Sequence, residues 1–495
     1  MSENSSSHVL TQAAVPLVVD LDGTLSKTDT LVEIFLLLVK KNVFLVLLLP
    51  FWLTKGKAFL KQKIALSVDF NADDLVYNLD LIEYIKAAKS AGRSVYLATG
   101  ADETIARAIK AKFNCFDGIF ASNGTVNLTG SKKQDKLNEA FGEQGFEYAG
   151  NASVDIRVWS SASHALVVCP NAEQLAIQAK AVCNQVQTIT LASATVKTYI
   201  KAVRVHQWVK NALIFVPLIV AHLLSNTDAW ISAGFGFIAF SLAASSVYVL
   251  NDLLDLAADR QHHSKCYRPF AAGSIALEKG ALLFPVFFIS AFSLAFFLPK
   301  GFIFALSFYY VLTVLYSFVL KRIVMLDTVV LAALYTMRII AGTLLIQVPF
   351  SFWLLAFSMF IFLSLALMKR YTELVQMIAN NKTTTAGRGY QANDAGMVAS
   401  FGAASGLLAV LVLALYVHSD VVTVFYKTEQ VLWLACPVLL YWVSRAWMIA
   451  HRGLMDDDPI VFAVKDKPSL ITGLIIAVIF FAATASWPIP TYMVN

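Results

Sequence analysis

The chain has 495 residues, of which 58% are hydrophobic and 15% are charged. A soluble fold needs more polar surface than this, so a purely soluble protein is excluded and most of the chain is expected in lipid. The net charge of +6 is mild. The lysines and arginines gather in loops between apolar runs, a pattern that is typical of membrane topology rather than of a nucleic-acid-binding patch, so we expect no nucleic-acid partner. The five cysteines lack CxxC spacing and are expected to be free thiols in a reducing compartment.

Residues 1–200 have the composition of a soluble domain, whereas residues 201–495 are mostly long apolar runs. The first residues are polar and lack the basic and apolar regions of a cleavable signal peptide, so we expect the first domain in the cytoplasm. Predicted helices alternate there with short apolar strands, the helices at 79–91 and 102–112 and the strands at 16–21, 94–98, 146–148 and 165–168. This alternation predicts a parallel α/β sheet.

An apolar run at residues 31–53 interrupts the first domain. Lys40, Lys41 and Asn42 split it, and each half is too short to span ~30 Å of hydrocarbon. Two interpretations stay open: a helical hairpin lying in the membrane surface, and a buried helix pair within the soluble domain.

The second domain is predicted to be all-α and to cross the membrane about nine times. The predicted spans are 211–224, 229–250, 280–298, 302–320, 326–346, 350–368, 397–417, 430–450 and 469–487. Most loop cations lie in four loops, at 251–279, 321–325, 369–396 and 451–468. By the positive-inside rule these loops are cytoplasmic, which puts the N-terminus inside and the C-terminus outside.

Two carboxylates, Asp20 and Asp22, directly follow the first predicted strand in the sequence DLDGTL. Side chains alternate along a strand, so both carboxylates point the same way and could bind one Mg²⁺ while leaving a nucleophilic oxygen. Gly23 permits the sharp turn that follows. This pattern resembles the haloacid dehalogenase superfamily of phosphatases, which implies a Rossmann-like α/β fold.

The resemblance extends to later motifs. Thr99 ends the second predicted strand, and Asn151 stands where that family usually has the first acid of a pair completed here by Asp155. Lys132, Lys133 and Lys136 are all available as the family's lysine, and we favour Lys133.

The same resemblance implies a role for each position. Asp20 would form an aspartyl-phosphate, and Asp22 would protonate the leaving alcohol and then activate water. Thr99 and Lys133 would hold phosphoryl oxygens. Mg²⁺ would be held by the oxygens of Asp20, Asp22, Asn151 and Asp155. The alternative is a decayed phosphatase fold that is kept as a scaffold.

A second acidic motif, Asn251, Asp252, Asp255 and Asp259, closes the second predicted span. On a helix these positions share one face. Three carboxylates at a membrane boundary repel one another unless divalent cations neutralise them, and Mg²⁺ prefers a few carboxylates plus phosphate oxygens. The motif therefore predicts a Mg²⁺–diphosphate site, against the alternative of a solvated acidic helix end.

This NDxxDxxxD pattern resembles the UbiA superfamily of intramembrane prenyltransferases over about residues 200–490. The resemblance implies that Asp327 belongs to a second metal-binding region, although this chain offers only one acid there. It also implies substrate contacts for the polar residues that flank both regions, namely Asn251, Lys265, Arg268, Tyr316, Lys321, Arg322 and Arg338.

Three further stretches, at 203–211, 368–373 and 456–466, are similar to the branch of that superfamily that includes decaprenylphosphate phosphoribosyltransferase. The similarity implies substrate contacts for Lys210, Lys369, Arg370 and Asp458. In that branch a polyprenyl phosphate attacks the anomeric carbon of phosphoribosyl diphosphate and releases diphosphate.

Together the two resemblances predict a bifunctional, Mg²⁺-dependent enzyme of the bacterial inner membrane, with both sites on the cytoplasmic side. Its transfer product keeps a 5-phosphate that the fused phosphatase could remove. One alternative is an aromatic prenyltransferase that uses a polyprenyl diphosphate and carries an unrelated phosphatase. A transporter or scaffold is disfavoured, because acid clusters in cytoplasmic loops do not describe a midplane substrate path. Isoprenoid length and oligomeric state stay open.

Overall fold

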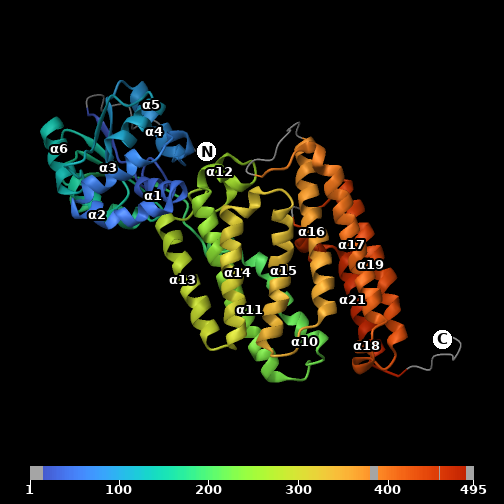
Figure 1. The fold of residues 1–495 in the computed structure, drawn as a ribbon. Coiled ribbons are helices and arrows are strands. Elements are labelled where there is room, and N and C mark those ends of the chain that lie inside the picture. Colours follow the sequence, from blue (N-terminus) through green and yellow to red (C-terminus); the bar gives the residue numbers. More distant parts are fainter. Residues whose placement is uncertain (1–14, 380–387, 456–457, 487–495) are drawn as a thin grey trace, which may run out of the picture. The chain divides into compact units, whose positions relative to one another are not determined.

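The computed structural model describes residues 15–379, 388–455 and 458–486 (Figure 1). The chain forms two compact units. The first unit comprises Met1–Val203 with Tyr248–Phe284, and the second comprises Arg204–Val247 with Pro285–Asn495. The segment Tyr248–Phe284 thus packs with the α/β domain, although it follows the predicted boundary in the sequence.

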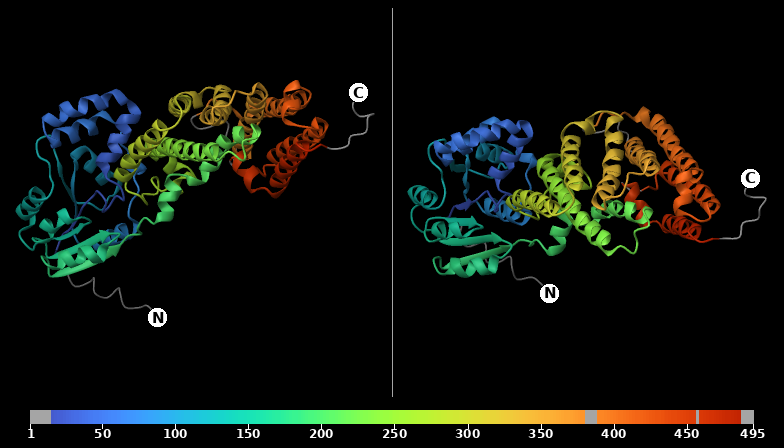
Figure 2. Two further views of the ribbon diagram at one scale, coloured as in Figure 1. Left: turned by 90° about the horizontal axis from the view of Figure 1, so that it is seen from below. Right: turned by 60° about the horizontal axis from the view of Figure 1, so that its bottom comes forward.

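The first unit contains a six-stranded parallel sheet in the order β3-β2-β1-β4-β5-β6, with helices on both faces (Figure 2). The strands are β1 (Leu17–Val19), β2 (Val95–Asp102), β3 (Gly118–Ser122), β4 (Glu147–Gly150), β5 (His164–Cys169) and β6 (Gln185–Thr190). The predicted parallel α/β sheet is confirmed. Sequence analysis did not predict β3 and β6.

The central strand β1 is buried on both faces. Leu17 and Val19 join one core, which includes residues of α4 (Leu79–Ser90) and α5 (Glu103–Lys112). Val18 joins the opposite core, which is covered by α6 (Ser131–Phe141), α7 (Ile156–Trp159) and α8 (Ala172–Lys180). Successive side chains of a strand point to opposite faces, so this short apolar strand fills both layers. Its carboxyl end, where Asp20 follows, therefore lies between β2 and β4.

The apolar run at 31–53 divides into two parts. Helix α1 (Thr30–Lys41) buries Ile34 and Leu38 in the first unit. The following η1 (Val43–Leu48) and α2 (Leu49–Thr54) instead expose large apolar side chains, including Phe44 (74%), Leu47 (75%) and Phe51 (60%). A buried helix pair therefore describes only the first half. A position in the membrane surface stays a prediction for residues 43–54, which precede α3 (Lys57–Ser67).

A buried ion pair joins α1 to α12 (Leu256–Gln261) within the first unit. The guanidinium of Arg260 lies 2.6 Å from a carboxylate oxygen of Glu33, and the two side chains are 9% and 6% exposed. Arg260 also donates to the carbonyl of Asp74 at 2.6 Å, and Thr28 donates to Glu33 at 2.7 Å. The pair therefore holds the segment Tyr248–Phe284 against the α/β domain.

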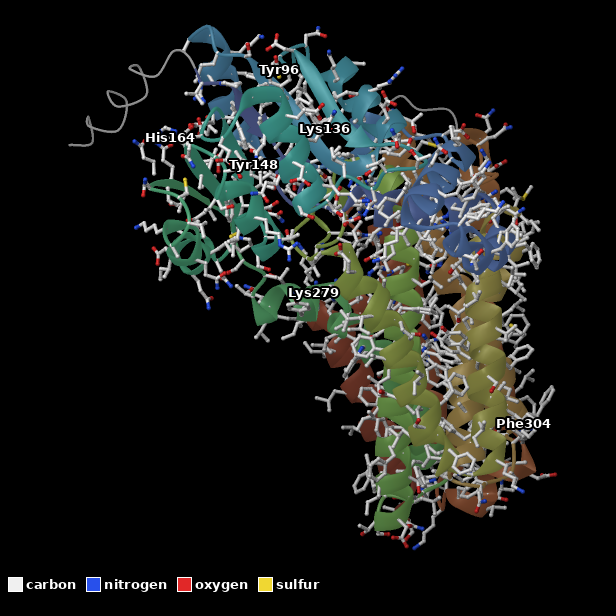
Figure 3. All side chains as sticks on the ribbon, turned by 90° about the vertical axis from the view of Figure 1, so that its left-hand side faces the viewer. Tyr96, Lys136, Tyr148, His164, Lys279 and Phe304 are labelled. Atoms are coloured by element: carbon white, nitrogen blue, oxygen red, sulfur yellow. The ribbon has the colours of Figure 1, made fainter. Side chains whose placement is uncertain are left out.

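Most of the remaining chain forms long apolar helices. These are α11 (Thr227–Leu254), α13 (Leu277–Phe296), α14 (Lys300–Phe318), α15 (Leu326–Leu345), α16 (Phe352–Ala379), α17 (Ala395–Val417), α19 (Ala435–His451) and α21 (Lys467–Ala483), the last of which follows the short α20 (Pro459–Lys465). Large apolar side chains cover their outer faces; Phe304, for example, is 75% exposed and points away from the helices in Figure 3. Such a surface is suited to lipid, and the chain is an integral membrane protein.

The number of spans is lower than predicted. Among the described residues, seven helices are long and apolar enough to cross a membrane, or eight if the bent pair α20 and α21 counts as one. The predicted first span, 211–224, is not among them. It corresponds instead to the two short pieces η4 (Val205–Phe215) and α10 (Val216–Val220).

These two short pieces nevertheless run between both ends of the second unit. In the middle of η4, Lys210 pairs with Asp458, and beyond the end of α10 His222 stacks on Phe425 with ring centroids 5.4 Å apart. A 3₁₀-helix rises about 2.0 Å per residue against about 1.5 Å for an α-helix, so the pieces cover about 30 Å despite their length. Gly342 of α15 permits this packing, because a Cβ there would lie 2.2 Å from the carbonyl oxygen of Ile214.

The far end of α21 lies beside the cation-poor loop 418–429. The backbone N–H of Thr428 donates to the carbonyl of Ala483 at 3.1 Å, and its hydroxyl donates to that of Ala485 at 2.8 Å. This loop contains α18 (Asp420–Phe425) and leads into η8 (Glu429–Leu434). The end of α21 and the loop therefore lie on the same side of the membrane, whichever way the spans are counted.

We expect a topology reporter fused after Asn495 to report an external location and one inserted at residue 385 to report a cytoplasmic one. Both positions lie outside the described residues. The physical reason is the cation asymmetry of the loops. Paired alkaline phosphatase and fluorescent-protein fusions measure the location. A cytoplasmic reading after Asn495 would contradict the orientation.

Candidate functional site

Four polar side chains meet at the carboxyl end of β1. The Nζ of Lys133, on α6, lies 2.6 Å from an oxygen of Asp20 and 2.9 Å from the hydroxyl of Tyr148. That hydroxyl donates to Asp155 at 3.1 Å. All four residues are buried, so Lys133 neutralises a carboxylate that is largely shielded from water. Of the three candidate lysines, Lys133 is the one that the fold brings to Asp20.

The loops after β1 and β4 are in close contact. The second oxygen of Asp155 accepts the backbone N–H groups of Asn151 and Ala152, both at 3.0 Å. Gly23 has φ +72°, and a Cβ at this position would lie 2.1 Å from the side-chain nitrogen of Asn151. Only glycine fits this turn, because it supplies both the positive φ and the space for the Asn151 amide.

Thr99 and a lysine that sequence analysis did not predict complete this edge of the sheet. Thr99 is fully buried, and its hydroxyl accepts the N–H of Ala101 at 2.9 Å. The Nζ of Lys61, on α3, lies 2.6 Å from the carbonyl of Gly100 and 2.9 Å from the side-chain oxygen of Asn127. Burial lowers the pKa of Lys61, while attraction to Asp22 opposes the shift. Helix α3 thus brings a cation to the last residues of β2, next to Thr99.

The carboxylates of this edge are crowded. Burial raises the pKa of Asp20 to about 7, opposed by Lys133 and assisted by Asp155 and Asp22. Burial and the charge of Asp29 raise the pKa of Asp22 to about 6, although Thr30 donates to Asp22 twice at 2.7 Å. A divalent cation among these oxygens would lower both pKa values. The donor set, carboxylate and amide oxygens, therefore fits Mg²⁺.

The second acidic motif lies at the junction of α11 and α12 in the first unit. One nitrogen of Arg268 lies 3.1 Å from Asp252 and 2.6 Å from Asp259, and both carboxylates are buried. Asp255 instead pairs with Lys40 of α1 at 3.2 Å. The helical face predicted for these acids is thus divided, with two of them turned to Arg268 and one to α1.

No three acidic, histidine or cysteine side chains converge closely enough to hold a metal ion in the part of the chain that the structure describes. Mg²⁺ is commonly held by one or two carboxylates, with substrate phosphates as further ligands. Asp252 and Asp259 meet that requirement, and Arg268 already supplies positive charge between them. The pair therefore fits a Mg²⁺–diphosphate better than a metal held by protein alone.

In the second unit, Asp327 begins α15 and is fully buried. The hydroxyl of Tyr390 donates to one of its oxygens at 2.6 Å, and Arg370 of α16 lies 2.8 Å from the other. Arg370 also pairs with Glu373, which in turn pairs with Arg388. Both oxygens of Asp327 thus face protein donors, which favours a role in positioning Arg370 over metal binding.

A second charged group in this unit combines two cations with one acid. Lys210 pairs with Asp458, and Lys369 lies 3.7 Å from the same carboxylate. Asp458 also caps α20 by accepting the N–H of Ile460 at 3.1 Å. The neighbouring acids, Asp456 and Asp457, lie outside the described residues. Two lysines that lie beside the same carboxylate suit a phosphate.

Arg338 lies in the middle of α15 and is 4% exposed. It donates to the side chain of Asn211 at 2.9 Å and to the hydroxyl of Tyr309 at 3.1 Å. Its guanidinium carbon also lies 5.0 Å from the ring centroid of Tyr309 and 5.4 Å from that of Tyr335. Hydrogen bonds and aromatic faces therefore stabilise this cation within the membrane segment.

The comparison with protein families decides what this membrane fold is. Residues 213–462 match the UbiA prenyltransferase family. The chain belongs to this family. The resemblance predicted from the acidic motif is thereby confirmed, together with the all-α membrane domain.

Curated UbiA relatives extend the comparison. An uncharacterized protein of Sinorhizobium fredii, y4nM, is 38% identical and aligns over 95% of this chain and 91% of its own length. The nodulation protein NoeC of Azorhizobium caulinodans is 37% identical over 57% of this chain and 92% of that protein. Decaprenyl-phosphate phosphoribosyltransferase of Mycobacterium tuberculosis is 32% identical over 35% of this chain and 59% of that enzyme.

The remaining predicted site residues of the UbiA domain differ in their exposure. Lys265 and Arg322 are exposed, and Lys321 is half-buried in η6 (Leu320–Arg322). Tyr316 of α14 interacts electrostatically with Arg370 and Arg388. The fold thus brings Tyr316 to the Asp327 cluster and leaves Lys265 and Arg322 at the surface.

Several residues were not predicted because the sequence gives them no motif. Tyr148 links Lys133 to Asp155, and the only signal for it was its place in the strand before Asn151. Tyr390 and Arg388 reach the acids of α15 and α16 from a loop without any characteristic pattern. Lys40 was recognised only as an interruption of an apolar run, and it contacts Asp255.

Proposed function

We propose that the chain transfers 5-phosphoribose from phosphoribosyl diphosphate to a polyprenyl phosphate, and then removes the 5-phosphate to leave polyprenylphosphoryl ribose. In the first step a phosphate oxygen of the lipid bonds to the anomeric carbon, and diphosphate leaves. In the second step water displaces the 5-phosphate as inorganic phosphate. The observation that carries the first step is the similarity of this UbiA domain to decaprenyl-phosphate phosphoribosyltransferases.

The charged groups of the UbiA domain support a substrate with phosphate at both ends. Asp252 and Asp259 would hold Mg²⁺, and Arg268 would turn from them to the diphosphate. Mg²⁺ would neutralise the charge that develops on the leaving diphosphate. Within the second unit, Lys210 and Lys369 lie beside the same carboxylate, Asp458, and two neighbouring lysines suit a phosphate group. An aromatic substrate would need no such second cationic group.

The contacts at β1 support phosphatase chemistry of the haloacid dehalogenase type. Asp20 would attack phosphorus and form an aspartyl-phosphate, while Asp22 would give its proton to the leaving sugar oxygen. Asp22 would then take a proton from the water that cleaves the aspartyl-phosphate. Lys133 would bind the phosphoryl oxygens, a task for which Tyr148 and Asp155 hold it.

A radiolabel assay tests the transfer. We expect membranes that contain the protein to move label from phosphoribosyl diphosphate into the lipid phase in the presence of Mg²⁺ and a polyprenyl phosphate. Chelation of Mg²⁺ should abolish the transfer, since the diphosphate would leave without charge neutralisation. Label that enters the lipid phase from a polyprenyl diphosphate and an aromatic acceptor, but not from phosphoribosyl diphosphate, would establish the alternative aromatic prenyltransferase.

A further inference from the structure

A cleft of about 1140 Å³ lies within the first unit, beside the β1 loop. One wall is formed by that loop, including Asp22 and Gly23, and by the loop after β4, including Asn151. The volume exceeds what a free phosphate needs and lies just above the range of about 300–1,000 Å³ typical of small-molecule sites. The cleft therefore suits a substrate in which a phosphomonoester is only one part.

The opposite wall of the cleft comes from residues 272–279, which follow the second acidic motif. The backbone N–H of Ser274 donates to the carbonyl of Pro269 at 2.9 Å, which folds this segment into a turn. Gly273 has φ +65°, and a Cβ there would lie 2.9 Å from the Cβ of Lys27 in the β1 loop. The turn thus approaches the β1 loop as closely as a residue without a side chain allows.

The same segment begins at the other candidate site. Arg268, which contacts Asp252 and Asp259, precedes Ala272 by four residues, a distance of at most about 14 Å along an extended chain. One continuous segment, 268–279, therefore carries a ligand-binding arginine at one end and a wall of the cleft at the other.

Two cationic side chains line the cleft. Lys27 belongs to the β1 loop, and Lys279 lies at the start of α13, where Figure 3 labels it. Both side chains are exposed. The Nζ of Lys279 lies 3.2 Å from the hydroxyl of Tyr199, which also lines the cleft. Among the described residues that line the cleft, Lys27 and Lys279 are the only lysines or arginines, and the carboxylates include Asp29 and Glu278. An anionic group that is not bound at Asp20 would therefore be placed at these lysines.

We propose that segment 268–279 is shared by both activities and that Lys279 binds the phosphodiester of the lipid-linked phosphoribose while its 5-phosphate lies at Asp20. This inference rests on the proposed function and deepens it, because it makes the phosphatase specific for the product of the transfer. Ribose 5-phosphate has the same phosphomonoester but lacks the diester, so Lys279 has nothing to bind in that molecule.

Steady-state kinetics of the purified full-length protein in detergent test the proposal with two substrates, polyprenylphosphoryl 5-phosphoribose and ribose 5-phosphate. We expect Lys279→Ala to raise KM for the lipid substrate about tenfold or more, as loss of one charge-assisted hydrogen bond predicts. The kcat/KM for ribose 5-phosphate should change less than about twofold, which also reports correct folding. Lys279→Arg should restore most of the affinity for the lipid.

A matched control is Lys180→Ala, which removes an exposed lysine at the end of α8, outside the cleft. This variant should change neither KM for the lipid substrate nor kcat/KM for ribose 5-phosphate. An equal KM for the lipid substrate in wild type and Lys279→Ala would overturn the inference while the proposed function stands. If the wild-type protein removes phosphate from ribose 5-phosphate but never from the lipid, both the inference and the second step of the proposed function fail.

Discussion

Replacing Asp252 with alanine is expected to lower the rate of phosphoribose transfer by about 100-fold or more. Asp252 is 2% exposed and shares Arg268 with Asp259. Its loss would remove a Mg²⁺ ligand where negative charge develops on the leaving diphosphate, an interaction worth several kcal/mol. Initial rates of label transfer from phosphoribosyl diphosphate, measured at equal protein in membranes, give the comparison.

Asp228→Ala is the matched control, because it removes an exposed carboxylate from the opposite end of the same helix. Asp255→Ala removes an acid of the motif that is 35% exposed and should also abolish transfer. Hydrolysis of ribose 5-phosphate by each variant reports that the protein is folded. Transfer above one-tenth of the wild-type rate in Asp252→Ala would contradict the assignment of this motif.

Asp20→Asn should make lipid-linked phosphoribose accumulate in place of lipid-linked ribose. Asparagine keeps the shape of the side chain but is a very poor nucleophile, so the aspartyl-phosphate cannot form and phosphate release should fall below detection. Transfer should continue, because its acids lie on α11 and α12. Mass spectrometry of extracted lipids should find a product heavier by one phosphate.

The control is Asp135→Asn, which makes the same chemical change at an exposed position of α6, two residues from Lys133. This variant should yield the same lipid as wild type. If Asp20→Asn membranes still yield the ribose lipid, purified protein distinguishes the causes, since no other phosphatase is then present. Release of phosphate by purified Asp20→Asn would show that Asp20 is not the nucleophile.

The sequence predicted those parts of the fold in which a local pattern carries the information. An apolar strand that ends in two acids led to β1 and its position in a parallel sheet, because alternation and turn residues act over a few positions. The acidic motif likewise lies within one stretch of helix. These local signals were enough to recognise the UbiA family.

Contacts between distant parts of the chain could not be predicted in this way. The hydroxyl of Tyr390 reaches Asp327 across 63 positions, and Lys40 reaches Asp255 across 215. The sequence alone also gave no sign that Asp327, an expected metal ligand, lies 2.8 Å from Arg370. Hydropathy also gave the wrong helix for residues 205–220. Span prediction assumes the rise per residue of an α-helix, whereas η4 in this segment is a 3₁₀-helix with a larger rise per residue.

The buried ion pair between Glu33 and Arg260 affects any attempt to express the two domains as separate polypeptides. A cut after Val203 would follow the apparent domain boundary, but it would place the two members of the pair on separate polypeptides. Each fragment would then lack the partner that its charge has in the intact chain, and coexpression would reunite the two charges. Attempts to isolate the α/β domain should therefore retain residues 248–284, joined to it through a short linker.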